Sequence, residues 1–448
     1  MARLFGTDGV RGIANTELDC ELAYRIGKAG AYVLSKELGE KPVILVGKDT
    51  RLSGDMLENA LSSGIMSAGG DVMLAGVIPT PAVAYLVRKY NLQAGVVISA
   101  SHNPMEYNGI KFFNSKGFKL RDEIEDEIEE YVKNPEKIPS AEKENVGRVL
   151  SCTSAVKDYI DFAKSTLNCD LKSLKIAVDC ANGATAKIAP QIFSDLGAMV
   201  FETGTEPDGT NINKNCGSTY IGNVCEFTKS VGADIGIAFD GDGDRVLFSD
   251  EFGNEIDGDQ VMAILGLYMK NNGALNDNTI VGTVMSNLGL TIFGEGNDIS
   301  IKQASVGDRY VLEKMLKYGY NLGGEQSGHV IILDYNTTGD GIITALQVLK
   351  ILKNTNARLS ELSSVIKKLP QVLVNTRVEN QNKEFVLKDE EILELIENVN
   401  IKLFKKGRVL VRASGTEPLF RVMLEGEDIE EITNYANEIA GLISQKYA

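Results

Sequence analysis

Three aspartates alternate with glycines in the segment Asp240-Gly-Asp-Gly-Asp-Arg245. The glycines let the backbone fold tightly, so the three carboxylates can converge on one point. Acids this close repel one another unless a cation lies between them, which disfavours a purely structural turn. Three loop carboxylates also leave coordination positions vacant for phosphate oxygen and water, an arrangement that suits Mg²⁺. We predict one Mg²⁺ ion per chain, bound by Asp240, Asp242 and Asp244.

The same segment has the outline of a calcium-binding loop, because Glu251 stands at its twelfth position. An EF-hand requires glycine at position six and a helix on each side. Here position six is Arg245, and the flanking segments 235–239 and 246–248 have the composition of strands. The sequence therefore favours magnesium over calcium.

A second loop, Ser99-Ala-Ser-His-Asn-Pro104, places a hydroxyl beside an imidazole. Alone, such a run of turn-forming residues is most often a surface turn. Ten residues after Ser101, Lys111 supplies an amine that can return to the hydroxyl, and no Gly-x-Ser-x-Gly elbow indicates an acyl-transfer hydrolase. The chain has two histidines, His102 and His329. Each lies in a polar, glycine- or turn-rich loop, and this coincidence favours a catalytic use over a structural one.

Two further loops combine polar side chains with glycine. The segment Arg412-Ala-Ser-Gly-Thr-Glu-Pro418 offers a guanidinium, two hydroxyls and backbone N–H groups, which together suit a phosphate, with a solvated turn as the alternative. Charge-assisted hydrogen bonds of this kind contribute about 1.5 to 3 kcal/mol each. The segment Gly324-Glu-Gln-Ser-Gly-His329 carries groups that bond sugar hydroxyls, with a helix N-cap as the alternative. The phosphate-binding candidates are Arg412, Ser414, Gly415, Thr416 and Arg421, and the sugar-binding candidates are Glu325, Ser327 and His329.

The bulk composition indicates a multidomain globular protein. Its 448 residues are too many for one hydrophobic core, and 43% hydrophobic with 24% charged residues is ordinary for a folded chain. A net charge of −16 repels nucleic acid, although clustered Arg and Lys side chains outweigh that field within about 8 to 10 Å. The sequence shows neither a signal peptide nor an apolar run of roughly 18 residues, and its six cysteines lack Cys-x-x-Cys spacing. We expect a cytoplasmic protein with free thiols and with no membrane or nucleic-acid partner.

Strand-like and helix-like segments alternate in an order that occurs three times, which indicates an internal repeat. This pattern predicts three similar α/β/α domains with mixed sheets, followed by a smaller α+β C-terminal domain that lacks the repeat. Ligands bind at strand ends in such sheets, so we expect the active site in the central cleft. The strands are expected at 43–46, 72–77, 95–99, 176–179, 199–202, 235–239, 280–284, 299–304 and 321–323. The predicted domains are 1–150 with the serine loop, 151–255 with the metal loop, 256–367 with the sugar loop and 368–448 with the phosphate loop.

Taken in order, these loops resemble those of the α-D-phosphohexomutase family over essentially the whole chain. Further motifs carry the likeness: Phe5-Gly-Thr-Asp-Gly-Val-Arg-Gly12, Gly47-Lys-Asp-Thr-Arg51 and Asn215-Cys-Gly-Ser-Thr219. Gln326 stands where members acting on mannose or glucose phosphates usually have Met, whereas Tyr220 departs from an expected histidine. The resemblance implies interconversion of glucosamine 6-phosphate and glucosamine 1-phosphate, a step toward UDP-N-acetylglucosamine and the cell wall. The alternatives are a mutase for mannose or glucose phosphate, a metal-dependent phosphatase and a sugar-phosphate sensor without catalysis.

The resemblance also implies a phosphoserine enzyme and a 1,6-bisphosphate intermediate that turns end for end. Ser101 would carry the phosphoryl group, and one phosphate oxygen would join the three aspartates around the metal. The phosphate loop would hold the non-reacting phosphate, and closure of the fourth domain would exclude water. The implied oligomeric state is a monomer or homodimer, and the identity of the general base stays open. The candidate catalytic residues are Ser101, Lys111, Arg11, His329, His102 and Arg245.

Overall fold

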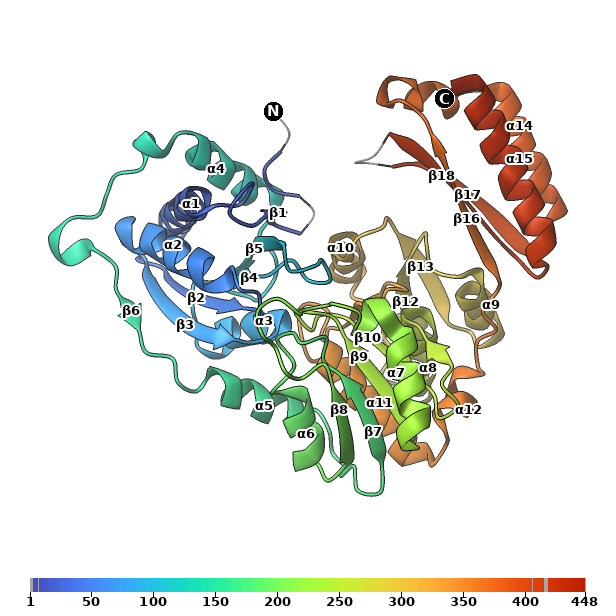
Figure 1. Ribbon diagram of the computed structural model, residues 1–448, viewed down its shortest axis with the longest axis horizontal. Helices are drawn as coiled ribbons and strands as arrows, with labels where there is room; N and C mark the ends of the chain where they lie inside the picture. Colours follow the sequence, from blue (N-terminus) through green and yellow to red (C-terminus); the bar gives the residue numbers. More distant parts are fainter. Residues whose placement is uncertain (1–2, 7, 405, 415–417, 448) are drawn as a thin grey trace. The chain divides into compact units, whose positions relative to one another are not determined.

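The computed structural model describes residues 3–6, 8–404, 406–414 and 418–447 (Figure 1). Four sheets follow one another along the chain, of six, five, four and three strands. Each of the first three combines parallel and antiparallel neighbours, whereas the last is wholly antiparallel. The predicted fold class, three α/β domains with mixed sheets before a smaller α+β domain, is confirmed. None of the described helices is both long and apolar enough to cross a membrane.

The first sheet has the strand order β1-β5-β4-β2-β3-β6. Its strands are β1 (Val10–Ile13), β2 (Val43–Lys48), β3 (Asp71–Val77), β4 (Ala94–Ile98), β5 (Tyr107–Asn114) and β6 (Val149–Leu150). The helices are α1 (Cys20–Leu38), α2 (Gly54–Ser67), α3 (Thr80–Lys89) and α4 (Asp122–Lys133). Alternate strand residues such as Ile44 and Val96 join the core with α1 and α2, whereas α3 packs from the other face, where Val83 and Val87 approach Gly95. The sheet is therefore covered on both faces.

The second sheet has the order β11-β10-β9-β7-β8, and the third has the order β13-β12-β14-β15. The second consists of β7 (Lys175–Asp179), β8 (Met199–Thr203), β9 (Ile235–Phe239), β10 (Val246–Ser249) and β11 (Glu255–Ile256), with helices α5 (Ala155–Ser165), α6 (Ala189–Asp195) and α7 (Ile221–Val231). The third consists of β12 (Thr279–Thr283), β13 (Ser300–Ala304), β14 (Leu322–Gly324) and β15 (Val330–Ile332). The helices in this stretch of the chain are α8 (Gly258–Asn271), α9 (Leu288–Gly296), α10 (Asp308–Tyr318), α11 (Gly341–Thr355) and α12 (Leu359–Ser363).

The repeat includes an antiparallel strand that the sequence pattern identified only in part. The pairs β4–β5, β9–β10 and β14–β15 are each antiparallel and consecutive in the chain. The serine loop, the metal loop and the sugar loop each connect one of these pairs. All three candidate loops therefore occupy the same position in their respective sheets.

The last sheet has the order β16-β18-β17, formed by β16 (Gln371–Arg377), β17 (Gly407–Ala413) and β18 (Leu419–Gly426). Helices α13 (Lys383–Val386), α14 (Glu390–Lys402) and α15 (Ile429–Tyr447) accompany it. Val422 and Leu424 of β18 share a core with α15 residues such as Ile439. This arrangement matches the smaller α+β domain that the sequence predicted.

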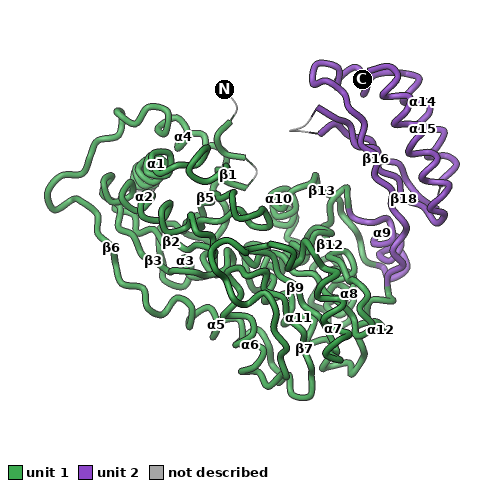
Figure 2. The backbone as a smooth tube through the Cα atoms, in the orientation of Figure 1, with its two compact units in different colours: residues 1–285, 299–365 green, residues 286–298, 366–448 purple. Residues whose placement is uncertain are grey.

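The chain divides into two compact units, of which the first comprises 1–285 and 299–365 and the second 286–298 and 366–448 (Figure 2). Helix α9 thus belongs with the C-terminal sheet. Glu425 of β18 accepts a hydrogen bond from the backbone N–H of Leu288 at 2.8 Å, and Arg408 donates to the carbonyl of Ser286 at 2.6 Å. Because the first three sheets share one unit, the boundaries at 150, 255 and 367 stay predictions.

Helices α1 and α2 pack at a very short separation. A Cβ atom on Gly64 would lie 2.0 Å from the carbonyl oxygen of Tyr24, and one on Gly27 would lie 2.2 Å from that of Leu61. Both distances are far below van der Waals contact. The two glycines therefore permit the packing that covers one face of the first sheet.

We predict that Gly64→Ala lowers the free energy of unfolding by about 1 to 3 kcal/mol, because the added methyl group collides with backbone on a neighbouring helix. Gly222→Ala is the matched control, since Gly222 lies exposed in α7 and a Cβ there meets nothing within 4 Å. The control should stabilise the protein by up to about 1 kcal/mol through helix propensity. Urea unfolding measures both, and equal effects from the two changes would contradict the packing argument.

Candidate active site

The serine loop and the metal loop meet at a buried hydrogen bond. The Oγ of Ser101 donates to Oδ2 of Asp240 at 2.6 Å, although the two residues are 139 positions apart. Ser101 is buried and has φ of 52°, in the left-handed region that non-glycine residues rarely adopt. The hydroxyl predicted to carry a phosphoryl group thus lies against the predicted metal ligands.

The three aspartates of the metal loop are buried, and one oxygen from each lies within 4.8 Å of the others. Burial, followed by the charges of Asp244 and Asp242, raises the pKa of Asp240 well above its usual value. Burial and Asp242 also raise the pKa of Asp244. Within the described part of the chain, Oδ1 of Asp242 and Oδ1 of Asp244 have no hydrogen-bond partner. A hard divalent cation fits this set, because it relieves the repulsion and uses the unpartnered oxygens.

The other carboxylate oxygen of Asp242, Oδ2, accepts hydrogen bonds from α3 and β5, which belong to the α/β unit of the first sheet. Thr80 donates to Asp242 twice, from its hydroxyl to Oδ2 at 2.7 Å and from its backbone N–H to the carbonyl at 2.9 Å. Lys111 donates to the same Oδ2 at 3.0 Å. Burial opposes ionisation here, but Lys111 outweighs it and holds the pKa of Asp242 below its usual range. Asp242 is therefore a carboxylate that presents Oδ1 to a cation.

Glu251, which suggested a calcium loop, does not belong to this cluster. Its carboxylate accepts hydrogen bonds from the hydroxyl of Ser360 at 2.5 Å and from the backbone N–H of Ser360 at 3.3 Å. It therefore forms a contact near α12. This geometry agrees with the sequence argument against an EF-hand.

A chain of alternating charges runs from the metal loop. Lys111 lies 3.0 Å from both Asp242 and Asp8, and Lys119 bridges Asp8 and Asp308 at 2.6 Å each. Arg11 also forms an ion pair with Asp8. Burial disfavours the charged amine of Lys111, but Asp242 and Asp8 outweigh it and raise its pKa above the usual value. Lys111 is therefore held as a cation by the two carboxylates.

The two histidines lie on either side of this network. The buried His329 places Nε2 at 3.7 Å from Asp308 and 3.9 Å from Asp244, and neither ring nitrogen has a hydrogen-bond partner among the described residues. His102 places Nδ1 at 3.3 Å from the hydroxyl of Ser101. Burial, then Arg245 and Arg11, lowers the pKa of His102 to about 4. Its imidazole is therefore neutral at physiological pH.

A cavity of about 430 Å³ opens beside these residues within the first unit. Glu325 is fixed at its wall, because its carboxylate accepts the backbone N–H of Gly307 at 3.0 Å. Ser327 is exposed and is not part of the lining, so its predicted contact with a sugar stays a prediction. The charged and ionisable lining residues are Arg3, Asp8, Arg11, Asp244, Arg245, Asp308, Glu325 and His329. An ionic ligand suits such walls better than an apolar one.

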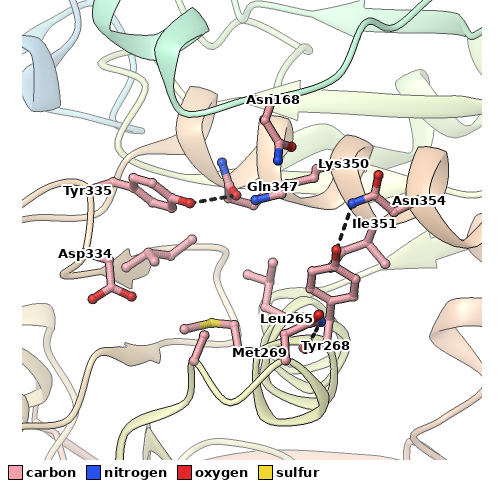
Figure 3. A pocket seen from close by; sticks show the side chains of 13 residues that line it. Asn168, Leu265, Tyr268, Met269, Asp334, Tyr335, Gln347, Lys350, Ile351 and Asn354 are labelled. Carbon is pink, nitrogen blue, oxygen red and sulfur yellow. Dashed lines mark hydrogen bonds between the residues drawn. The ribbon is translucent and has the colours of Figure 1, made fainter.

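A second cavity, of about 290 Å³, lies between α8 and α11 (Figure 3). Two pairs of its polar side chains bond to one another: Tyr335 donates to Gln347 at 3.2 Å, and Asn354 donates to the hydroxyl of Tyr268 at 2.8 Å. None of the candidate catalytic, metal or sugar-binding residues lines it. The candidate residues therefore gather at the first cavity, beside the metal loop, and not at the second.

The candidate phosphate-binding residues belong to the second unit. Arg412 of β17 stands directly opposite Arg421 of β18, so the two guanidinium groups extend from one face of the sheet. Burial, followed by the charge of Arg421, lowers the pKa of Arg412. Ser414 is buried, and its carbonyl accepts a hydrogen bond from Lys383 at 2.6 Å. Gly415 and Thr416 lie outside the described residues.

The sequence argument did not identify Asp8, Lys119 or Asp308 as site residues. Asp8 offered a weak signal, because it lies with Arg11 in the glycine-rich segment near the N-terminus. Lys119 and Asp308 offered none, since they are 189 positions apart and neither lies in a distinctive loop. Only the folded arrangement brings these three charges together.

Comparison with known proteins supports the family resemblance seen in the sequence motifs over the whole chain. Profiles of the phosphoglucomutase/phosphomannomutase family match four consecutive segments: alpha/beta/alpha domain I at 2–139, domain II at 157–253, domain III at 257–369 and the C-terminal domain at 373–442. A phosphoglucosamine mutase of Clostridium novyi is 58% identical over 447 residues, covering 100% of this chain and 99% of that protein. One of Clostridium acetobutylicum is 56% identical over 447 residues, covering all of both chains.

Solved structures share the fold at lower sequence identity. A phosphoglucomutase/phosphomannomutase family protein of Burkholderia thailandensis superposes with a TM-score of 0.80 at 23% identity, covering 98% of each chain. The N-acetylphosphoglucosamine mutase of Aspergillus fumigatus, solved with GlcNAc-6P and magnesium, gives 0.70 at 17% identity, covering 99% of this chain and 96% of that one. The matched segments together span nearly all of the sequence, and the chain belongs to the phosphoglucomutase/phosphomannomutase family.

Proposed function

We propose that this chain interconverts glucosamine 6-phosphate and glucosamine 1-phosphate through a phosphorylated Ser101. The observation that carries the proposal is the 2.6 Å hydrogen bond from the Ser101 hydroxyl to Asp240, inside a buried cluster of three carboxylates. The choice of sugar rests on relatives that are named phosphoglucosamine mutases and are at least 55% identical along the whole chain. Such a product is consumed in the synthesis of UDP-N-acetylglucosamine and the cell wall.

We further propose Mg²⁺ as the ion held by Asp240, Asp242 and Asp244, since their oxygen donors and unpartnered Oδ1 atoms fit a small hard cation. When bound, the ion neutralises charge on the transferring phosphoryl group. Asp242 is held ionised for this purpose by Lys111. Asp240, which accepts the hydroxyl of Ser101, orients that oxygen toward the cluster.

The remaining groups are proposed to bind and orient the sugar phosphate. Arg11, Arg245 and Lys111 supply positive charge near the reacting phosphoryl group, and the acidic neighbours Asp242 and Asp8 keep Lys111 protonated despite its burial. Glu325, Ser327 and His329 bind ring hydroxyls, so one wall can accept the bisphosphate in either orientation. His102 is neutral and lies next to the Ser101 hydroxyl. Arg412, Ser414 and Arg421, with Gly415 and Thr416, bind the phosphate that does not react.

We also propose that the protein acts in the cytoplasm on a small diffusible substrate, as a monomer or homodimer. The net charge of −16 disfavours nucleic acid as a partner. A phosphomannomutase or phosphoglucomutase uses the same groups, and a metal-dependent phosphatase differs only in transferring the phosphoryl group to water. The experiments below separate these activities.

We predict that Ser101→Ala abolishes isomerisation, because no other group takes the place of the hydroxyl that relays the phosphoryl group. Intact-mass analysis of the purified wild type should reveal a fraction about 80 Da heavier, which the variant lacks. Ser63→Ala is the control, since Ser63 is an exposed serine of α2 whose hydroxyl donates to the carbonyl of Asn59 in the same helix. Undiminished turnover in the Ser101 variant would exclude a phosphoserine mechanism.

We predict that Asp240→Asn raises the melting temperature of the metal-free protein and removes its response to Mg²⁺. The reason is that burial and two acidic neighbours disfavour the ionised Asp240, and the neutral amide relieves that repulsion. For the wild type, Mg²⁺ at about 100 times its Kd should stabilise the fold by about 2.7 kcal/mol. Sodium chloride at equal ionic strength controls for screening. An equal Mg²⁺ response in both proteins would place the ion elsewhere.

We predict that the wild type turns over glucosamine 6-phosphate with a higher kcat/KM than mannose 6-phosphate or glucose 6-phosphate. A coupled assay that detects each 1-phosphate product measures the three values in parallel. Faster turnover of mannose or glucose phosphate would replace the proposed substrate while keeping the mechanism. Release of inorganic phosphate in excess of isomerised sugar would instead identify a phosphatase.

A further inference from the structure

The serine loop keeps its shape through its backbone carbonyl groups. Ser101 has φ of 52°, a conformation that costs an L-residue about 1 to 2 kcal/mol and therefore needs support from its surroundings. The backbone N–H of Ser101 donates to the hydroxyl of Ser99 at 2.9 Å, and Ser99 in turn donates to Asp49 at 2.6 Å. The carbonyls of Ser101 and Asn103 are both bound by the same two side chains.

The first of these side chains is Arg51, from the same sheet as Ser101. Its guanidinium is fully buried and bonds to Asp49 at 2.9 Å. It donates to the carbonyl of Ser101 at 2.9 Å, to that of Asn103 at 2.8 Å and to that of Pro104. Replacing Arg51 would leave the buried Asp49 without its cation and would destabilise the fold. A loss of activity in such a variant could not be assigned to the position of Ser101 alone.

The second side chain is Asn213, which comes from the connection between β8 and α7 of the second sheet. Its amide Nδ2 donates to the carbonyl of Ser101 at 2.8 Å and to that of Asn103 at 3.0 Å. Each of the two carbonyl oxygens thus accepts one hydrogen bond from Arg51 and one from Asn213, which uses both of its lone pairs. Asn213 itself is buried with φ of 57°, and its backbone N–H donates to the carbonyl of Ala181 at 2.9 Å. The amide is thus fixed to its own sheet while it holds the serine loop of another.

Close packing makes this contact a rigid one. A Cβ atom on Gly241, between two of the metal-loop aspartates, would lie 2.7 Å from the carbonyl of Ser101 and 2.8 Å from the amide nitrogen of Asn213. The absence of a side chain at position 241 therefore allows the metal loop, the serine loop and Asn213 to meet. A shift of the amide changes the position of Ser101 relative to Asp240 and Asp242.

We propose that Asn213 is a positioning residue for phosphoryl transfer, which fixes the Ser101 hydroxyl relative to the metal loop through the carbonyls of Ser101 and Asn103. This inference rests on the proposed function of Ser101. In the step concerned, the ester bond between phosphorus and a sugar oxygen breaks, a bond from phosphorus to Oγ of Ser101 forms, and the proton of the hydroxyl passes to the sugar oxygen. A displacement of about 1 Å at such a centre costs on the order of 100-fold in rate.

The test variant is Asn213→Asp, assayed at saturating Mg²⁺ because the buried carboxylate lies near the metal loop. It keeps the size of the side chain and tolerates positive φ, but it replaces the N–H donor by an oxygen that repels both carbonyls. We expect kcat for isomerisation to fall by about 10- to 100-fold while KM stays within about twofold, because the substrate contacts are unchanged. The matched control is Asn211→Asp, whose amide bonds to Glu206 and Asp208 in the same connection and does not contact the serine loop. The control should retain wild-type kcat.

A second measurement follows Ser101 without depending on the sugar that the enzyme isomerises. Dephosphorylated protein is mixed with glucose 1,6-bisphosphate, and intact mass follows the appearance of the phosphorylated form. Slow uptake by Asn213→Asp, with a melting temperature equal to that of Asn211→Asp, supports positioning. Uptake at the wild-type rate, or an equal loss in both variants, overturns it. Wild-type uptake without isomerisation of glucosamine phosphate would contradict only the proposed substrate.

Discussion

Three carboxylates held together in a buried loop are the constraint on which the rest of this site depends. Isolated in a medium of low polarity, such a group of like charges would take up protons or separate. The structure instead supplies hydrogen-bond donors to two of the three: Ser101 donates its hydroxyl to Asp240, and Asp242 accepts from the hydroxyl of Thr80 and the ammonium of Lys111. These donors all come from the α/β unit of the first sheet. The negative charge of the metal loop therefore attracts the serine loop and the start of α3 toward it.

The same constraint extends outward through alternating ion pairs. Lys111 contacts Asp242 and Asp8, and Lys119 contacts Asp8 and Asp308. Asp242 belongs to the second sheet's loop, the two lysines and Asp8 to the first domain's segments, and Asp308 to the start of α10 in the third. Each charge is stabilised by its neighbours, so the position of every charged group around the cavity depends on the others. In the proposed reaction, walls whose charges are already oriented reduce the reorganisation required during transfer.

Site residues and strands could be predicted from the sequence where their pattern lies within one short segment. The Asp-Gly-Asp-Gly-Asp spacing and the two histidines are visible in short segments, and the structure places Ser101 beside Asp240 and Lys111 beside Asp242. Strands such as β2 and β9 could be predicted because each contains an apolar run. Strand β15 has three residues, which are too few to show a strand pattern. Asn213 and Asp308 act through contacts more than a hundred positions away, and no local pattern encodes such contacts.

Helix α9 has a consequence for how the chain folds as it is made. Its segment, 286–298, packs with the C-terminal sheet, yet it emerges from the ribosome before any strand of that sheet. In the finished structure the backbone N–H of Leu288, at the start of α9, bonds to Glu425 of β18, 137 positions further along the chain. During translation this N–H must therefore wait for its partner, and a chain that stops before β18 leaves the start of the helix open to misassociation.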